Sequence, residues 1–521
     1  MEESSNIVFS SFAKELPADP LMLNKTRVVE SAFFSWVKPE LFPCASLVHS
    51  NPILKAEMGL EYLDERELLK LTLGANSESD GKSYAMCYGG HQFGQWAGQL
   101  GDGRAINIGE VKNHGRSYAL QIKGAGPTPY SRRADGFAVL RSSIREYLCS
   151  ESMHHLSVPT TRAITLALSG NKVCRDPMYD GNTLDEKGAI VCRVAPSFIR
   201  FGNFQILAAR EDKENLQKLV DYTIKHHFPE IGGDSKEQAI SLLKASADKT
   251  REMIIHWQRV GFVHGVMNTD NMSIHGVTID YGPYGWLENY DENWTPNTTD
   301  AQNKRYGFQN QLKISLWNLL QLANGLYPLI EDAAPLEEIL HEYDDLIMKD
   351  YHQMMCAKLG LNNWEEIGVE FIKQLRELLT KTQLDYVMFF RLLSELESYS
   401  EDEIKSLLLR TSYQTNDVVK IQMNEWSEWF QELEQMIEKE GKVPEQRAEQ
   451  MNSQNPKYVL RNYMAQLAIE AADNEDYTVL NELFELLKKP YDEQPNMEKW
   501  FAKRPSWALE KVGCSMLSCS S

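Results

Sequence analysis

The chain has 521 residues, of which 42% are hydrophobic, 25% are charged and 10% are aromatic. This is the composition of an ordinary globular protein of about two to four domains, and it excludes a fibrous or mostly disordered chain. With 54 Lys and Arg against 74 Asp and Glu, the formal net charge is −20, which argues against a nucleic-acid-binding protein and against a polybasic membrane-surface protein.

Other features of the sequence bear on compartment and ligand. No apolar run approaches the ~20 residues of a membrane span, and the acidic start of the chain lacks the pattern of a signal or transit peptide. The eight cysteines have neither zinc-binding spacing nor the density of a disulfide scaffold, so we expect a reducing compartment. Residues 101–200 carry 14 Lys or Arg against 9 Asp or Glu, which indicates either an anionic ligand such as a phosphate group or chance surface variation.

The first candidate motif is glycine-rich, with six glycines among the sixteen residues 89–104. Backbone N–H groups in such a segment can bind phosphate oxygens, and Arg104 adds a permanently charged donor. The segment is not a Walker A loop, because no Gly-Lys-Ser/Thr follows it. A simple chain reversal without any ligand is the alternative that this pattern leaves open.

Two strands are predicted next, over 105–111 and 118–123, because apolar side chains alternate along them. Lys123 ends the second strand. A glycine-rich turn between strands, followed by a lysine on the next strand, is the plan of a protein-kinase N-lobe. In that plan the lysine binds ATP phosphates and pairs with a glutamate on a helix.

A helix predicted over 137–149 from its apolar spacing supplies such a glutamate, Glu146. The alternative for Glu146 is an ordinary solvated residue on a surface helix. Asp135 and Gly136 come just before the predicted helix. For Asp135 we favour a capping role over contact with a nucleotide.

Arg193 and Arg200 lie in the largely apolar stretch 189–202. A buried arginine is costly unless an anion or a carboxylate matches its charge. The two arginines therefore predict either a clamp for nucleotide phosphates or buried salt bridges. From residue 206 onward helical periodicity dominates, except for a strand-like island at 262–280 and a long loop at 281–303.

The most specific motif lies within this island and follows a helix that is predicted to end near Arg259. A polar loop with Asp270 and Asn271 leads into an expected hairpin that turns at 275–276 and ends in Asp280-Tyr281-Gly282. Kinase-like C-lobes have the same order of catalytic loop, Mg²⁺-binding Asn, two short strands and Asp-Phe-Gly.

The residue types in this motif suit phosphate chemistry. Asp270 can accept a proton from an attacking hydroxyl, and Asn271 and Asp280 offer the hard oxygen ligands that Mg²⁺ prefers. Asp270 is adjacent to Asn271, whereas about five residues separate the corresponding kinase residues, which argues against an ordinary protein kinase. We expect structural roles for His264 and His275, because neither has a ligand or base partner at a suitable spacing.

Together these elements predict an α+β, protein-kinase-like bilobal fold. We expect an N-terminal extension that packs on the core over 1–83 and an N-lobe with the nucleotide loop over 84–205. We further expect a C-lobe with catalytic and metal-binding loops over 206–330 and a helical C-terminal region with a cysteine-containing tail over 331–521.

At these positions the chain closely resembles the selenoprotein O family of protein adenylyltransferases, whose bacterial members are called YdiU. The resemblance covers nearly the whole chain and is densest over 84–290. It is carried by the stretches His91–Gly94, Leu100–Arg104, Lys123–Arg132, Arg141–Glu146, His264–Asn271 and Ile279–Pro283.

The resemblance implies an enzyme that binds ATP in the reverse orientation to kinases and transfers AMP to Ser, Thr or Tyr hydroxyls of proteins, with release of pyrophosphate. It implies Mg²⁺, or Mn²⁺ in its place, held by Asn271 and Asp280, with Asp270 as general base. The residues implied at the ATP site are Gly101, Gly103, Arg104, Lys123, Asp135, Gly136, Glu146, Arg193, Arg200 and Asp280, with Glu146 paired to Lys123.

The implied partners are ATP and protein substrates, with no nucleic acid and no membrane span. Animal relatives point to mitochondria, and the lack of a visible presequence makes the cytoplasm the alternative. Cys519 stands where animal members carry selenocysteine; we expect free thiols at Cys514 and Cys519, with a disulfide between them as the alternative. The competing functions are a kinase-like phosphotransferase and a nucleotide-binding pseudokinase scaffold.

Overall fold

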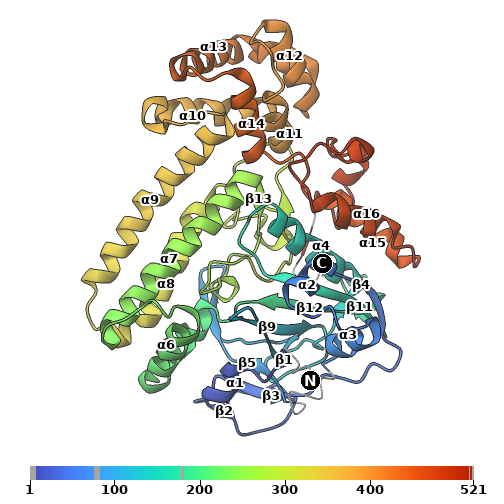
Figure 1. Ribbon diagram of the computed structural model, residues 1–521, viewed down its shortest axis with the longest axis vertical. Helices are drawn as coiled ribbons and strands as arrows, with labels where there is room; N and C mark the ends of the chain where they lie inside the picture. Colours follow the sequence, from blue (N-terminus) through green and yellow to red (C-terminus); the bar gives the residue numbers. More distant parts are fainter. Residues whose placement is uncertain (1–6, 75–81, 178–180, 515–516, 519–521) are drawn as a thin grey trace.

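The computed structural model describes residues 7–74, 82–177, 181–514 and 517–518. Figure 1 shows a strand-rich half in blue and cyan beside long green and yellow helices, with orange and red helices at the far end. This mixed architecture confirms the predicted α+β class. The domain boundaries at 83, 205 and 330 stay a prediction.

Ten strands of the described chain form one sheet. Their spatial order is β2-β3-β5-β8-β9-β12-β11-β4, with β1 paired to β8 and β10 paired to β12. Only the short β2–β3 pair is parallel among the described pairs of this sheet. The bounds are β1 Ile7–Val8, β2 Ala18–Asp19, β3 Phe34–Val37, β4 Ser46–Ser50, β5 Ser83–Met86, β8 Ala105–Asn113, β9 Arg116–Lys123, β10 Ala138–Val139, β11 Arg162–Arg175 and β12 Leu184–Ala195.

The two strands predicted after the glycine-rich segment are β8 and β9, which pair antiparallel. Leu120 and Ile122 of β9 are fully buried in a core with side chains of α2 (Pro52–Glu57) and α3 (Glu65–Thr72). Because side chains alternate along a strand, Gln121 and Lys123 point to the opposite face of the sheet. That face carries the candidate site.

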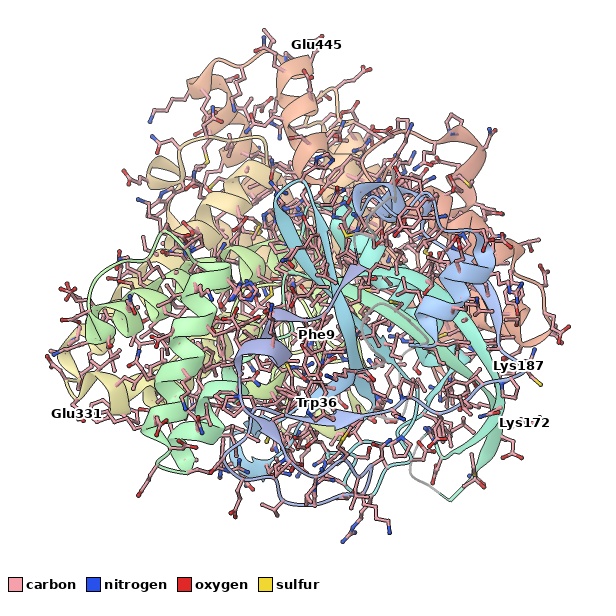
Figure 2. The ribbon with its side chains drawn as sticks, turned by 60° about the horizontal axis from the view of Figure 1, so that its bottom comes forward. Phe9, Trp36, Lys172, Lys187, Glu331 and Glu445 are labelled. Atoms are coloured by element: carbon pink, nitrogen blue, oxygen red, sulfur yellow. The ribbon has the colours of Figure 1, made fainter. Side chains whose placement is uncertain are left out.

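The N-terminal segment joins this sheet. β1 pairs with β8 and β3 pairs with β5. Phe9 stacks on Trp36 with the ring centroids 6.1 Å apart, and Figure 2 shows the two residues near each other in the middle of the view. From α1 (Ser11–Glu15), Phe12 contacts Tyr84 of the sheet and Tyr222 of α6 (Lys213–His227), so this segment connects the two halves.

The helix that carries Glu146 is α4 (Leu140–His155), which begins three residues later than predicted. Ala138 and Val139 instead form β10 and pair with β12, and a backbone extended in this way cannot start a helix. α4 packs on β11 and β12, while α15 (Asn462–Asp473) and α16 (Thr478–Leu487) cover it from the C-terminal region. Glu146 is only 2% exposed, so the solvated alternative is wrong.

Helices dominate from residue 206 onward, as predicted, and the first of them, α5, begins at Phe201. The helix predicted to end near Arg259 is α7, which begins with a capping box at Asp234 and ends at Gly261 in the left-handed conformation. α7 (Ser235–Val260) packs against α8 (Asn310–Ile330) and α9 (Ala334–Lys358). The remaining bounds are α5 Phe201–Ala209, α10 Trp364–Thr382, α11 Tyr386–Leu393, α12 Glu401–Thr411, α13 Asn416–Glu440 and α14 Pro444–Gln454.

The hairpin expected within 262–280 is wrong. β13 (Phe262–Val263) pairs with β14 (Gly285–Trp286) across the whole motif. Ser273 and Thr278 do not pair with each other but form isolated bridges to Arg200 and Thr160. The short extended pieces therefore join distant parts of the chain, which local alternation cannot reveal.

Candidate active site

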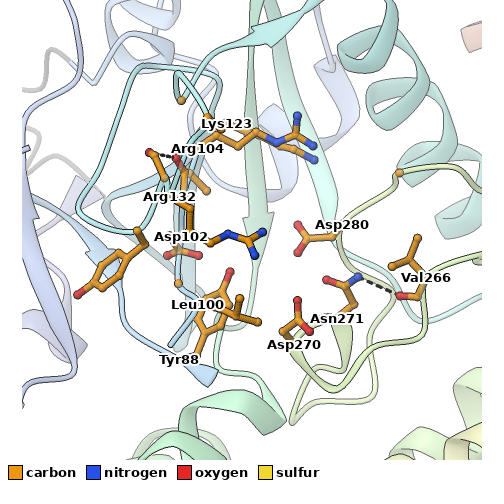
Figure 3. A pocket seen from close by; sticks show the side chains of 18 of the residues that line it. Tyr88, Leu100, Asp102, Arg104, Lys123, Arg132, Val266, Asp270, Asn271 and Asp280 are labelled. Atoms are coloured by element: carbon orange, nitrogen blue, oxygen red, sulfur yellow. Dashed lines mark hydrogen bonds between the residues drawn. The ribbon is translucent and has the colours of Figure 1, made fainter. Parts of the chain in front are cut away.

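A cavity of about 620 Å³ lies between the sheet and the loop that carries Asp270. Figure 3 shows Asp270, Asn271 and Asp280 along one side, facing the segment with Leu100, Asp102 and Arg104. Eleven of the twelve predicted site residues line it: Gly101, Gly103, Arg104, Lys123, Asp135, Gly136, Arg193, Arg200, Asp270, Asn271 and Asp280. The twelfth, Glu146, lies behind Lys123.

Lys123, Glu146 and Arg193 form a buried chain of charges. The Lys123 Nζ lies 2.6 Å from the Glu146 Oε2, and the Arg193 Nη1 donates to the Glu146 Oε1 at 3.0 Å. Burial lowers the pKa of Lys123. Burial opposes ionisation of Glu146 as well, but Lys123 and Arg193 outweigh it and lower the pKa of Glu146. The pairing predicted for Lys123 and Glu146 is present.

Asp280 lies between the two arginines. The Arg193 Nη1 donates to the Asp280 Oδ1 at 2.6 Å, and the Arg200 Nη1 donates to the Asp280 Oδ2. Although burial opposes ionisation of Asp280, Arg200 and Arg193 hold its pKa well below the usual range. The salt-bridge alternative for these arginines is therefore present in this structure, and both guanidinium groups also line the cavity.

Asp270 and Asn271 end a short 3₁₀ turn, Thr269–Asn271. Burial raises the pKa of Asp270 to about 6, and its Oδ1 makes no hydrogen bond within the described part of the chain. The Asn271 Nδ2 donates to the carbonyl of Val266 at 2.9 Å, which fixes the amide at the cavity wall. The arrangement places a buried carboxylate beside the amide of Asn271 at the cavity wall.

Two glycines of the glycine-rich segment, Gly101 and Gly103, have a packing role that the sequence did not reveal. Gly101 has φ +140°, and a Cβ there would lie 2.4 Å from the Tyr130 ring. A Cβ at Gly103 would lie 2.9 Å from the Tyr130 carbonyl. The Thr128 Oγ1 donates to the Asp102 carbonyl at 2.7 Å. The turn around Tyr130 thus holds this loop in place at the cavity.

Asp135 does not cap α4, because the N-cap of that helix is Val139. Asp135 instead pairs with Arg175, at 2.7 and 2.8 Å, and accepts the Phe137 N–H at 3.0 Å. Both Asp135 and Arg175 line the cavity. Of the two roles weighed for Asp135, the capping interpretation is wrong.

Replacing Gly136 by Ala is expected to destabilise the fold. Gly136 has φ +78°, and a Cβ would lie 2.2 Å from Gly126. Gly115 is the matched control, because it has φ +75° and a Cβ there would meet no heavy atom within 4 Å. Backbone strain alone costs about 1–2 kcal/mol in either variant, and overpacking adds about 1–3 kcal/mol at Gly136. Denaturant unfolding measures both; equal losses would contradict the clash.

Several residues that the sequence reasoning missed complete the site. Buried Asp102 accepts hydrogen bonds from the Met86 N–H at 3.0 Å and from Asn107 at 3.1 Å, and its Oδ1 lies 3.8 Å from the Arg200 Nη2. The Arg200 guanidinium also lies 4.7 Å from the Tyr88 ring centroid. Asp102 could have been predicted from its place inside the glycine-rich motif, whereas no pattern in the sequence pointed to Tyr88.

The basic side chains of the cavity come from the basic segment of the sequence, residues 101–200. All seven basic side chains that line the cavity within the described chain come from residues 104–200: Arg104, Lys123, Arg132, Arg133, Arg175, Arg193 and Arg200. Four aspartates face them, so a net positive lining remains in a protein whose formal charge is −20. Such a cavity attracts a polyanion.

His264 and His275 have structural roles, as expected. The Nε2 of buried His264 bonds to the Ile279 carbonyl at 2.9 Å, and its Nδ1 accepts the Val266 N–H at 3.3 Å. His264 thereby joins the two segments that carry Asp270 and Asp280. The His275 Nε2 bonds to the Ser197 Oγ at 2.7 Å.

Within the described ranges no cluster of three His, Cys, Asp or Glu side chains forms a ready metal site. Asn271 and Asp280 nevertheless fit Mg²⁺, which is bound by one or two protein oxygens together with substrate phosphates.

Cys519 lies outside the described residues, and burial raises the pKa of Cys514 to about 11. Among the described helices, none combines the length and the apolar character that crossing a membrane requires.

Comparison with known proteins gives consistent matches over nearly the full chain. The family model described as "Protein adenylyltransferase SelO" matches residues 22–488. A "Protein nucleotidyltransferase YdiU" of Flavobacterium johnsoniae is 56% identical over 515 residues, 98% of either chain. Proteins of the same name from Rhodopirellula baltica, covering 98% of either chain, and from an Azoarcus species, covering 99%, are each 49% identical.

Proposed function

Because the chain belongs to the SelO family of protein adenylyltransferases, and is therefore a nucleotidyltransferase, we propose that the cavity binds ATP and that AMP passes to Ser, Thr or Tyr hydroxyls of protein substrates. One observation carries this proposal: Lys123, Arg193 and Arg200 meet Asp270 and Asp280 in a single cavity with a basic lining. Family membership favours AMP transfer over the phosphotransferase and the pseudokinase scaffold.

In the proposed reaction, the negative charge that develops on the leaving pyrophosphate would lie near these cations. The acceptor oxygen forms a bond to the α-phosphorus, and the bond from that phosphorus to the bridging oxygen of pyrophosphate breaks. Pyrophosphate leaves with a large negative charge, which Lys123, Arg193 and Arg200 would stabilise. Because these groups are already held by Glu146 and Asp280, little reorganisation is needed when charge develops.

Asp270 is proposed as the general base. Its carboxylate is buried at the cavity wall, and its Oδ1 makes no hydrogen bond within the described residues. The carboxylate can receive the proton of an acceptor hydroxyl as the hydroxyl attacks. Asn271 and Asp280 would hold Mg²⁺, or Mn²⁺ in its place. When bound, the metal would supply further positive charge to the phosphates.

Labelled ATP tests this function directly. With Mg²⁺ and a protein acceptor, ATP labelled at the α-phosphate should leave label on protein, while ATP labelled at the γ-phosphate should not. Removal of divalent metal with EDTA should abolish the transfer. Bound γ-label without α-label would contradict AMP transfer and favour a kinase, and ATP binding with neither label transferred to any of a panel of protein acceptors would favour the scaffold.

A further inference from the structure

The segment before the nucleotide loop is a hairpin that the function above does not use. It consists of β6 (Gly89–Gln92) and β7 (Gln95–Gln99), in which Gln92 pairs with Gln95. The hairpin lies on the loop that carries Asp270. The His91 N–H donates to the Thr269 Oγ1 at 2.7 Å, and this threonine donates in turn to Gln205 at 2.7 Å.

The hairpin tip is strained and is held by the same loop. Phe93 has φ +51°, a left-handed conformation that is unfavourable for a residue with a bulky side chain. Its N–H donates to the Asn268 Oδ1 and to the Tyr306 hydroxyl, each at 3.1 Å. The Tyr306 hydroxyl also donates to the Asn268 Oδ1 at 2.6 Å. This network offsets the strain only while the hairpin rests on the loop.

Two contacts from the hairpin fix the Asp270 side chain itself. The Gln92 Nε2 donates to the Asp270 Oδ2 at 3.2 Å, and Gln92 lines the cavity. Gly90 lies under the carboxylate, because a Cβ there would be 2.7 Å from the Asp270 Oδ1. One oxygen is therefore held by Gln92, and the other stays without a hydrogen bond in the described structure.

We propose that Gln92 is a positioning residue: through its hydrogen bond to the Asp270 Oδ2 it holds the carboxylate in the orientation in which it receives the proton of the acceptor hydroxyl. This inference rests on the proposed role of Asp270. The hairpin runs directly through Leu100 into Gly101 and Gly103 at the nucleotide loop. One continuous segment therefore contains both the glycines proposed to bind the nucleotide and the side chain proposed to orient Asp270.

The test replaces Gln92 with Met, which keeps the length of the side chain and removes the donor. We expect kcat for transfer of α-labelled AMP to fall about 10- to 100-fold, as for other small misplacements of reacting groups, while KM for ATP and its calorimetric Kd stay within about twofold, as expected when an interaction acts mainly in the transition state. Gln92→Asn, whose amide is too short, should behave in the same way. Gly90→Ala should also lower kcat, because its Cβ displaces Asp270.

Gln95→Met is the matched control, since Gln95 is the exposed partner of Gln92 in the same hairpin; its kcat should not change. The proposal is overturned if Gln92→Met keeps kcat within about twofold of the wild type, or if ATP affinity falls by the same factor as kcat. Asp270→Asn separates the two levels of inference. If that variant remains fully active, the proposed base fails and this inference with it; if it is inactive while Gln92→Met is not, only the inference fails.

Discussion

Replacing Asp280 by Asn should reduce AMP transfer about 1,000-fold, which is the upper end of the loss seen when one preorganised electrostatic group is removed. Asp280 is the carboxylate on which Arg193 and Arg200 converge, and it is one of the two proposed metal ligands. The variant loses the oxygen charge that a divalent cation requires. The measurement is the rate of α-label transfer at saturating ATP and Mg²⁺.

ATP binding distinguishes a catalytic loss from a lost fold in this variant. In Asp280→Asn, Arg200 loses its closest carboxylate and Arg193 keeps only Glu146, so nucleotide affinity measured without metal should be equal to that of the wild type or higher. Asp221→Asn, the same chemical change on the exposed side of α6, should leave both quantities unchanged. Transfer above one tenth of the wild-type rate in Asp280→Asn would show that Asp280 does not hold an essential metal.

Replacing Glu146 by Gln should have the largest effect on stability, a loss of about 3–5 kcal/mol in the free energy of unfolding. Glu146 is the carboxylate partner of Lys123 and one of two for Arg193, and both cations are almost fully buried. Removing it leaves the Lys123 charge in a low-dielectric environment without compensation. Urea unfolding at neutral pH measures the loss.

The pH dependence of this loss follows from the lowered pKa of Glu146 in the folded chain. Its contribution is complete above the pKa of an unfolded glutamate and disappears as the pH falls through the lowered folded value, so the two curves should converge in acid. Lys123→Met is the companion variant and should cost less, because Glu146 keeps Arg193 as a partner. A loss below 1 kcal/mol in Glu146→Gln would contradict a buried, coupled ion pair.

The local elements of the site could be read from the sequence because their signals are local. Alternation along 118–123 placed Lys123 on a strand, and apolar spacing placed Glu146 on a helix. The order of Asp270, Asn271 and Asp280 in one short motif indicated the chemistry. The errors occurred where distant segments compete for the same residues. Ala138 and Val139 pair with β12 and so do not join the predicted helix. Asp135 forms an ion pair with Arg175 and does not cap that helix.

The sequence by itself determined the residue types, their order and the excess of basic residues in 101–200, because composition and periodicity need no knowledge of contacts. Only the tertiary structure decided that Asp280 pairs with two arginines and that Gln92 donates a hydrogen bond to Asp270. It also decided that Tyr130 leaves no room for a Cβ at Gly101 or Gly103. Asp270 follows Gln92 by 178 residues. Contacts at such separations depend on how the sheet and the helical half pack, and no local pattern in the chain encodes that packing.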